Sequence, residues 1–413
     1  MKRILILTAD TGLGHRSAAN AVASALQEQY GAECSVSIVN PMDHPAASPL
    51  LRNVQADYDR MVREMPDLYR LGYQTLSGPL PNALIESAFT VMLFEALRDI
   101  LRQAQPDAIV DTYESYLAPL DAIFTIRGQR IPLVTTVTDL ATLHPAWFND
   151  TTDLCMVPTQ IAYDLGVSYG LPPSKLKITG LPVNPRFASE KRDKAAIRAE
   201  LGWRSDLITV LAVGSPRVNN VPEMLNVLNH SGLPLQLVIV CGGNDSLYQH
   251  VMETEWHSDV QRYNFVDNMP TLMHAADCVM GKAGGLFVSE ALASGLPILL
   301  IDMIQGQETG NTDFVVNSGA GEYAHDPVQA LEIMFHWMDK GAVLLAERAQ
   351  KARAVGHPRA AYEVADLVLQ AAQHKTAPKH KRVTNLRSLT ELLTNFNIPW
   401  KEESPANAVD ADE

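Results

Sequence analysis

The chain has 413 residues, 46% of them hydrophobic, which is enough for two α/β domains with substantial cores. Its 33 Lys and Arg residues against 47 Asp and Glu residues give a net charge of −14, and this balance argues against general nucleic-acid binding. It does not exclude a membrane, because a local basic patch can still meet anionic lipid.

The N-terminal apolar run stops at Ala9, which predicts a first strand and not a signal peptide. No run approaches the about 20 apolar residues that span a bilayer, so we expect a cytoplasmic protein whose membrane contact is peripheral. The cysteines lack C-x-x-C spacing and lie in or beside strand-like segments, which predicts buried thiols, with a disulfide or metal site as the alternative. They are Cys34, Cys155, Cys241 and Cys278.

The predicted strand at residues 4–9 leads through the turn DTGLGH into a helix that begins near His15. A glycine turn before a helix N-terminus suits an anion, and His15 lies at the tip of this turn. A neutral imidazole there can accept a proton near physiological pH. The structural alternative is a capping role or a hydrogen bond to a neighbouring loop, and we favour the functional role.

Residues 43–81 are irregular in pattern, whereas apolar residues recur about every four positions across residues 81–105, which predicts an amphipathic helix. The periodicity favours a helix packed on a sheet. The alternative is that part of this apolar surface, or the loop before it, dips into a membrane. Six arginines could then meet lipid phosphates: Arg52, Arg60, Arg63, Arg70, Arg98 and Arg102.

Strands predicted at residues 108–112, 132–138, 154–157 and 176–179 alternate with helical stretches, which indicates a doubly wound parallel sheet. The loop after the second of these strands contains Asp139, His144 and Trp147. Asp139 and His144 could serve as base and orienter, or as capping and structural groups. A Trp beside a His at a strand end favours an acceptor-side site.

The Pro-rich residues 180–187 mark a change in composition, so we place a domain boundary there, with domains at residues 1–182 and 183–355. The second half restarts an α/β pattern with strands at residues 208–213 and 235–241, and two such halves imply a cleft between them. A helix within residues 356–373 is expected to cross back to the first domain. The tail, residues 374–413, is basic and then acidic and is expected to be partly disordered; its Asp410 and Asp412 are not a metal site.

Residues 281–321 predict a glycine turn, a helix over 287–294, a buried strand over 296–301 and a second helix near Gln307. The turn and helix N-terminus suit a phosphate. Glu290, Gln307, Glu308 and Asn311 add groups that recognise hydroxyls, so the stretch predicts a nucleotide-sugar site. The alternative is an ordinary βαβ unit whose glycines only permit close packing.

Taken together, the motifs TADTGLGHRSAA, TDLATLHPAWF, GLPVNP and residues 281–321 resemble those of the monogalactosyldiacylglycerol synthases and bacterial diacylglycerol glycosyltransferases. The resemblance to the lipid-linked N-acetylglucosaminyltransferase of peptidoglycan synthesis is more distant. The resemblance to the synthase family implies an α/β protein of GT-B architecture, with two Rossmann-like doubly wound domains facing a cleft. It also implies inverting transfer of galactose or glucose from UDP-galactose or UDP-glucose to diacylglycerol, near anionic membrane lipids and without a metal or other cofactor.

By position, the resemblance makes His15 the candidate catalytic base or acceptor-positioning group, with Asp139 as the alternative. The acceptor side comprises Gly12, Gly14, His144 and Trp147. On the donor side it implies that Glu290 binds the ribose and that Gln307 and Glu308 bind the sugar, with a supporting hydrogen bond from Asn311. It places the backbone at Val266 at the uracil, and Lys282 and Gly284 at the diphosphate. Gly214, Ser215 and Arg217 are further candidates for donor binding.

The chain departs from the family pattern at Leu13, in the loop at residues 214–218, and at Leu286 and Phe287. These positions lose glycines and a hydroxyl, which removes freedom for close approach to a phosphate. Arg217 is placed to compensate as a charged phosphate ligand. Two alternative functions follow, a UDP-sugar 2-epimerase and a non-catalytic binder of UDP or lipid; the apolar, Arg-rich residues 52–102 argue against the epimerase.

Overall fold

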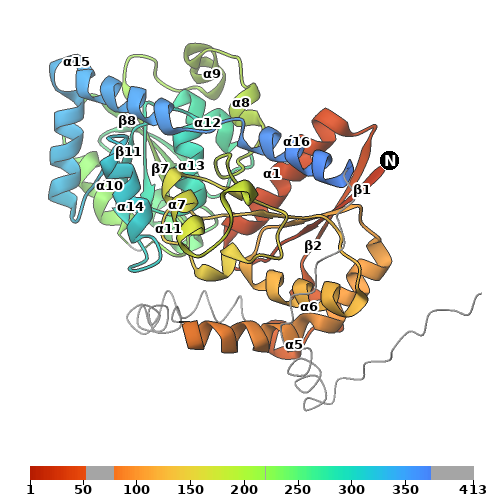
Figure 1. Ribbon diagram of the computed structural model, residues 1–413. Helices are drawn as coiled ribbons and strands as arrows, with labels where there is room; N and C mark the ends of the chain where they lie inside the picture. The colour runs from red at the N-terminus through yellow and green to blue at the C-terminus, as the bar shows by residue number, and fades with distance from the viewer. Residues whose placement is uncertain (53–78, 219, 374–413) are drawn as a thin grey trace, which may run out of the picture.

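The computed structural model describes residues 1–52, 79–218 and 220–373, which form two α/β halves (Figure 1). Each half contains a six-stranded parallel sheet, in the order β2-β1-β3-β4-β5-β6 in the first and β12-β11-β10-β7-β8-β9 in the second. Both sheets are flanked by helices, as parallel sheets require because their faces must be buried. The predicted architecture of two doubly wound domains is therefore confirmed.

The first sheet and its helices occupy the N-terminal part of the chain. Its strands are β1 (Lys2–Leu7), β2 (Cys34–Val39), β3 (Ala108–Asp111), β4 (Leu133–Thr136), β5 (Leu154–Val157) and β6 (Leu176–Ile178). Its helices are α1 (Leu13–Tyr30), α2 (Pro49–Arg52), α5 (Pro79–Ala104), α6 (Leu117–Arg127) and α7 (Gln160–Ser168), with short 3-10 turns η1 (Pro41–Asp43), η2 (Glu114–Tyr116), η3 (Pro145–Phe148) and η4 (Pro173–Lys175).

The second half repeats the pattern. Its strands are β7 (Ile208–Val213), β8 (Leu235–Val240), β9 (Asp259–Tyr263), β10 (Cys278–Lys282), β11 (Ile298–Asp302) and β12 (Gly321–Tyr323). Its helices are α8 (Arg186–Ser189), α9 (Lys194–Leu201), α10 (Val221–Asn229), α11 (Asp245–Glu253), α12 (Met269–Ala275), α13 (Gly285–Ala293), α14 (Thr309–Asn317), α15 (Pro327–Val355, interrupted by non-helical residues 339–342) and α16 (Ala360–Gln373). The predicted boundary between residues 182 and 183 falls between the last strand of the first sheet and the first strand of the second.

The last described helix, α16, returns to the first half and packs against α1 (Figure 1). Two hydrogen bonds join the helices: the Tyr30 hydroxyl donates to Asp366 at 2.6 Å and the Tyr362 hydroxyl donates to Glu28 at 2.6 Å. Apolar residues of both helices and of the strands behind them form one buried cluster. The predicted C-terminal crossover is therefore confirmed.

The apolar stripe of α5 packs inward, as its periodicity favours. Leu93, Leu97 and Leu101 are buried in a cluster with α6 and β1. Arg98 is paired with Glu95 on the same helix, and Arg102 lies 3.3 Å from Asp99. The loop proposed as a membrane contact, with Arg60, Arg63 and Arg70, and the basic tail lie outside the described residues.

The four cysteines are all buried and all free, which confirms the predicted buried thiols and excludes the disulfide alternative. Burial raises the pKa of each thiol, so the thiols stay protonated at neutral pH. Within the described ranges, no helix is long and apolar enough to cross a membrane.

Candidate active site

A cavity of about 920 Å³ lies between the two halves, where loops from the carboxyl ends of strands in both sheets meet. We call it the interdomain cavity. It collects every predicted site residue except Asn311, which is buried behind it. The predicted residues that line it are Gly12, Gly14, His15, Asp139, His144, Trp147, Gly214, Ser215, Arg217, Val266, Lys282, Gly284, Glu290, Gln307 and Glu308.

His15 projects into the cavity from the first turn of α1, after Gly12 turns the chain with a φ of 93°. Its Nδ1 lies 2.8 Å from the carbonyl oxygen of Thr112 and 2.8 Å from the hydroxyl of Thr138. A carbonyl oxygen only accepts, so the tautomer that fits carries its proton on Nδ1 and leaves Nε2 as the acceptor.

Two aromatic rings hold the imidazole of His15 in place. The Tyr113 ring meets it edge-on with centroids 5.0 Å apart, and the Trp147 ring stacks on it at 6.2 Å. Burial lowers the pKa of His15 to about 4, against a smaller raising effect from the Thr112 hydrogen bond. The side chain is therefore neutral at physiological pH, which is the state a proton acceptor needs.

Asp139 joins the two halves. Its Oδ1 accepts from Asn311 Nδ2 at 2.7 Å and from its neighbour's amide, Leu140 N, at 2.9 Å, while Asn311 also donates to the Ala283 carbonyl at 3.0 Å. Asn311 thus gives the supporting hydrogen bond expected of it, but to the protein. Burial raises the pKa of Asp139 to about 7.

His144 does not pair with Asp139. Its Nδ1 accepts from the Ala146 amide at 3.3 Å and caps η3, which positions Trp147 against His15. The structure therefore gives His144 the capping role and does not support the base-and-orienter pair.

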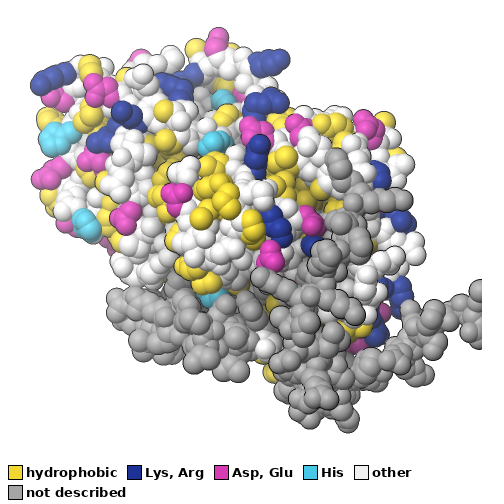
Figure 2. Space-filling view, viewed as in Figure 1, with side chains coloured by type: hydrophobic (Ala, Val, Ile, Leu, Met, Phe, Trp, Pro, Cys, Tyr) yellow, Lys and Arg dark blue, Asp and Glu magenta, His cyan; other side chains and the backbone are white. Residues whose placement is uncertain are grey.

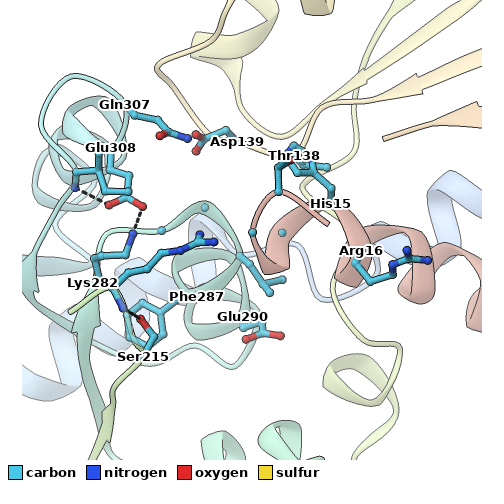
Figure 3. A pocket seen from close by; sticks show the side chains of 18 of the residues that line it. His15, Arg16, Thr138, Asp139, Ser215, Lys282, Phe287, Glu290, Gln307 and Glu308 are labelled. Atoms are coloured by element: carbon cyan, nitrogen blue, oxygen red, sulfur yellow. Dashed lines mark hydrogen bonds and ion pairs between the residues drawn. The ribbon is translucent and has the colours of Figure 1, made fainter. Parts of the chain in front are cut away.

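On the opposite wall, Lys282 at the end of β10 forms an ion pair with Glu308 (Figure 3). The other carboxylate oxygen of Glu308 accepts from the Ile304 amide at 2.7 Å, and only 5% of this residue is exposed. Each oxygen of Glu308 thus contacts the protein and keeps a further lone pair, so the contact with a sugar stays a prediction. Gln307 lines the cavity and points toward Asp139 (Figure 3).

Helix α13 begins beside Lys282, with Gly284 at its N-cap and no side-chain cap. Its first-turn N–H groups and positive dipole end therefore face the cavity wall that Lys282 also lines. Glu290 projects from the next turns of the same helix, and burial raises the pKa of its carboxyl to about 8. This wall therefore combines a helix N-terminus, which suits an anion, with the carboxyl group of Glu290 on the same helix.

The loop after β7 and the segment after β9 complete the donor-side wall. Ser215 accepts from the Arg217 amide at 3.2 Å, which fixes the loop. A Cβ on Gly214 would lie 2.5 Å from Cδ2 of Leu247, so a larger residue here would have to displace that side chain. Val266 lines the cavity next to Phe265, which is 72% exposed.

Sequence reasoning missed Glu114, which follows β3 and lines the same cavity. Its Oε2 is buried and, among the described residues, has no hydrogen-bond partner. Burial raises its pKa to about 7, and the nearby Asp139 adds to the effect. Its place at the carboxyl end of a parallel strand was the signal that could have identified it.

The two candidate bases predict different acid limbs for the reaction rate. If His15 is the base, kcat/KM, which reports the groups of the free enzyme, should stay within about twofold between pH 7.5 and 5.5, because its pKa of about 4 keeps it neutral throughout. If Asp139 is the base, kcat/KM should halve near pH 7 as its carboxylate is protonated. A pH profile of wild type and Asp139→Asn, which keeps an oxygen for Asn311, distinguishes them. A fall near pH 7 that Asp139→Asn removes would overturn the assignment to His15.

In the part of the chain that the structure describes, no cluster of three or more His, Cys, Asp or Glu side chains is placed to hold a metal ion. The positive groups that line the cavity include Lys282, Arg217 and the N-terminus of α13, together with Arg16, which is paired with Asp10.

Known protein families match both halves of the chain. Residues 15–183 match the family described as monogalactosyldiacylglycerol (MGDG) synthase, and residues 209–356 match the glycosyltransferase family 28 C-terminal domain. The chain is 32% identical over 376 residues to the chloroplastic monogalactosyldiacylglycerol synthase of Spinacia oleracea, covering 88% of this chain and 71% of that protein. It is 30% identical to monogalactosyldiacylglycerol synthase 1 of Arabidopsis thaliana, covering 88% and 70%.

Solved structures share the fold at low sequence identity. MurG of Acinetobacter baumannii superposes with a TM-score of 0.60 at 18% identity, covering 90% of this chain and all of that chain. The UDP-GlcNAc 2-epimerase of Neisseria meningitidis gives a TM-score of 0.55 at 13% identity, with 90% and 100% coverage. These likenesses support the GT-B fold alone. The sequence matches over both halves show that the chain is a glycosyltransferase and belongs to the monogalactosyldiacylglycerol synthase family.

Proposed function

We propose that this chain transfers galactose or glucose from a UDP-sugar to diacylglycerol at a membrane surface, with inversion at the anomeric carbon. The observation that carries the proposal is the interdomain cavity itself. A neutral histidine on the first half faces a cationic wall with an open helix N-terminus on the second half. The plant relatives are named for monogalactosyldiacylglycerol, which supports a hexose donor and a diacylglycerol acceptor.

In the proposed reaction, Nε2 of His15 removes the proton from the acceptor hydroxyl as its oxygen attacks the anomeric carbon from the face opposite UDP. The bond from that carbon to the diphosphate oxygen breaks, and UDP leaves with the electron pair. The new glycosidic bond has the β configuration when the donor is α. The positioning of His15 by Thr112, Thr138 and Trp147 prepares this step.

Lys282 and the N-terminus of α13 stabilise the departing diphosphate in this proposal. The ammonium group of Lys282 has three N–H donors, and its ion pair with Glu308 uses one of them. Fixed positive groups at the leaving oxygen lower the barrier without reorganising during the reaction. The mechanism therefore assigns no step to a metal, because these groups supply positive charge where it is needed.

For the rest of the donor, Glu290 is proposed to bind the ribose hydroxyls, Gln307 the sugar, and the backbone near Val266 the uracil. All three line the interdomain cavity. The raised pKa of Glu290 is consistent with a carboxyl group that awaits a hydrogen-bonding ligand.

The acceptor is proposed to enter along an apolar wall formed by Phe89, Tyr113, Ala146 and Trp147. Phe89 belongs to α5, so this helix contributes to the cavity wall as well as to the core of the first half. Figure 2 shows hydrophobic side chains gathered on the face where Figure 1 places α7, whose exposed residues include Ile161 and Val167. Diacylglycerol is an uncharged lipid that would match such a wall.

Membrane association is expected to require anionic lipid and apolar surface of the first half. We expect the purified chain to float with vesicles containing anionic lipid and to float less with neutral vesicles. Removing residues 374–413 tests the basic tail. Unchanged flotation of the shortened chain would remove the tail as a necessary anchor, and failure of the full chain to float would contradict membrane association.

An assay with labelled donor separates this proposal from its alternatives. Purified protein is incubated with UDP-[14C]galactose or UDP-[14C]glucose and diacylglycerol vesicles. Label in the organic phase supports transfer to lipid. An epimerised UDP-sugar supports a 2-epimerase, the activity named for one of the structural neighbours. Binding of UDP with neither product supports a non-catalytic binder.

A further inference from the structure

The loop after β7 carries an arginine that reaches across the interdomain cavity. Arg217 belongs to the second half, but its guanidinium group lies over Gly12 in the turn before His15. A Cβ on Gly12 would stand 3.0 Å from Nη1 and 3.7 Å from Nη2 of Arg217. The φ of 93° at Gly12 also favours glycine, so the turn is shaped to admit the guanidinium.

The positive charge of Arg217 acts on His15. It lowers the pKa of the imidazole, in addition to the larger effect of burial, while Asp10 on the other side raises it. Asp10 is itself bound by Arg16, with Oδ1 2.7 Å from Nε and Oδ2 2.7 Å from Nη2. The Coulomb effect of Asp10 on His15 is therefore partly offset.

The other charged groups around His15 are paired with other side chains or only partly ionised at neutral pH. Lys282 is paired with Glu308. Glu114 and Asp139, which line the same cavity from η2 and the loop after β4, have pKa values raised to about 7. Tyr113 meets the ring of His15 edge-on. Arg217 is thus a cation of the donor-side wall whose charge acts on the imidazole of His15.

We propose that Arg217 is a bridging residue that binds the diphosphate of the donor while lying over the Gly12 turn, and so couples donor binding to the position and basicity of His15. This inference rests on the proposed UDP-sugar function. A guanidinium group offers five N–H donors in a planar fork that fits two phosphate oxygens at once. Arg217 lines the same cavity as Lys282 and Gly284, so its guanidinium group adds positive charge to the donor-side wall.

One consequence is that His15 becomes more basic when the donor is present. A bound diphosphate places negative charge beside Arg217 and cancels part of its field at the imidazole. His15 is then a weaker base in the empty cavity than in the donor complex. Proton abstraction from the acceptor is thereby favoured only when a leaving group is in place.

Binding of UDP and UMP to variants tests the diphosphate contact. We expect Arg217→Gln to weaken UDP binding by about 10- to 100-fold, with Arg217→Lys between it and wild type, because the lost hydrogen bonds involve two charged groups. UMP, which lacks the second phosphate, should be affected less. Arg204→Gln is the matched control, because it removes an exposed arginine of the same half that pairs with Asp206 and Asp259.

Gly12→Ala tests the bridge from the opposite half. The added methyl group would displace the guanidinium, so UDP binding should weaken although Gly12 lies on the acceptor side. In the Arg217→Gln background the same change should cost less UDP affinity than in wild type, since the displaced group is already gone and only the strain at the positive φ of Gly12 remains. Equal costs in both backgrounds would overturn the bridge, and thermal melting confirms that each variant is folded.

The pKa of His15, followed by NMR of labelled histidine, tests the coupling directly. If Arg217 had only a structural role, its replacement would leave this pKa unchanged. We expect the pKa to rise when UDP binds wild type, and to start higher and change less in Arg217→Gln. Wild-type UDP affinity in Arg217→Gln, or an unchanged response of His15, would overturn the inference and leave the proposed function standing. Failure of wild type to bind UDP would instead remove the proposed function and this inference together.

Discussion

Replacement of His15 by alanine is expected to lower the transfer rate by about 10³-fold and to leave the Kd for UDP within about twofold of wild type. The imidazole is neutral, its Nδ1 is fixed by Thr112, and its Nε2 is left to accept the acceptor proton. The donor contacts lie on the opposite wall of the cavity, so donor affinity should survive. Initial rates with labelled donor and calorimetric titration with UDP measure the two quantities.

His15→Gln is the matched control for this result. A glutamine amide can still donate to the Thr112 carbonyl, but it cannot take up a proton at neutral pH. It should therefore be as inactive as His15→Ala while keeping the fold and the ring contacts of Tyr113 and Trp147 closer to wild type. Wild-type turnover in either variant would remove His15 from the chemistry and promote Asp139.

Loss of Lys282 is expected to have the second large effect, and on two properties at once. Lys282→Met should lower kcat by about 10²-fold, because a fixed cation no longer faces the leaving diphosphate. It should also lower the free energy of unfolding by about 3 kcal/mol, because the carboxylate of Glu308 remains buried without its partner. Steady-state kinetics and urea unfolding measure the two changes.

The pair can be separated by a second substitution. Glu308→Gln keeps an oxygen that accepts from the Ile304 amide and carries no charge. The double variant Lys282→Met with Glu308→Gln should therefore recover most of the lost stability while its kcat stays low. Recovery of kcat together with stability would show that Lys282 acts only through the fold and does not contact the diphosphate.

The sequence was sufficient for the elements whose signals are local. Period-two and continuous apolar runs located most strands, and a glycine turn before a helix located His15 on α1. Helix α13 begins two residues before the predicted start, because Gly284 and not a later residue is its N-cap. The strands β9 and β12 were not predicted, since β9 is exposed and mixed in polarity and β12 has only three residues.

The contacts that make the cavity were beyond local reasoning. Asp139 and Asn311 are 172 positions apart, and Arg217 reaches Gly12 from the other half of the chain. Such pairs depend on how two independently patterned domains face each other. Even the nearby Asp139 and His144 were paired by hypothesis, whereas loop geometry turned one toward α14 and the other into a cap.

Glu308 illustrates the same limit at the level of a single side chain. Its type and place after β11 suggested hydroxyl recognition, but the side chain folds back onto Lys282 and the Ile304 amide. Composition cannot show which groups of the protein a carboxylate contacts. Glu290 lines the same cavity, and burial raises the pKa of its carboxyl group to about 8.

The configuration of the lipid product tests the central claim most directly. Wild-type protein is incubated with an α-linked UDP-sugar and diacylglycerol, and the anomeric proton of the extracted glycolipid is observed by NMR. A β-glycoside is predicted, because His15 activates the acceptor hydroxyl on the face opposite the diphosphate. An α-glycoside, or the absence of any glycolipid from a protein that binds UDP, would contradict the account.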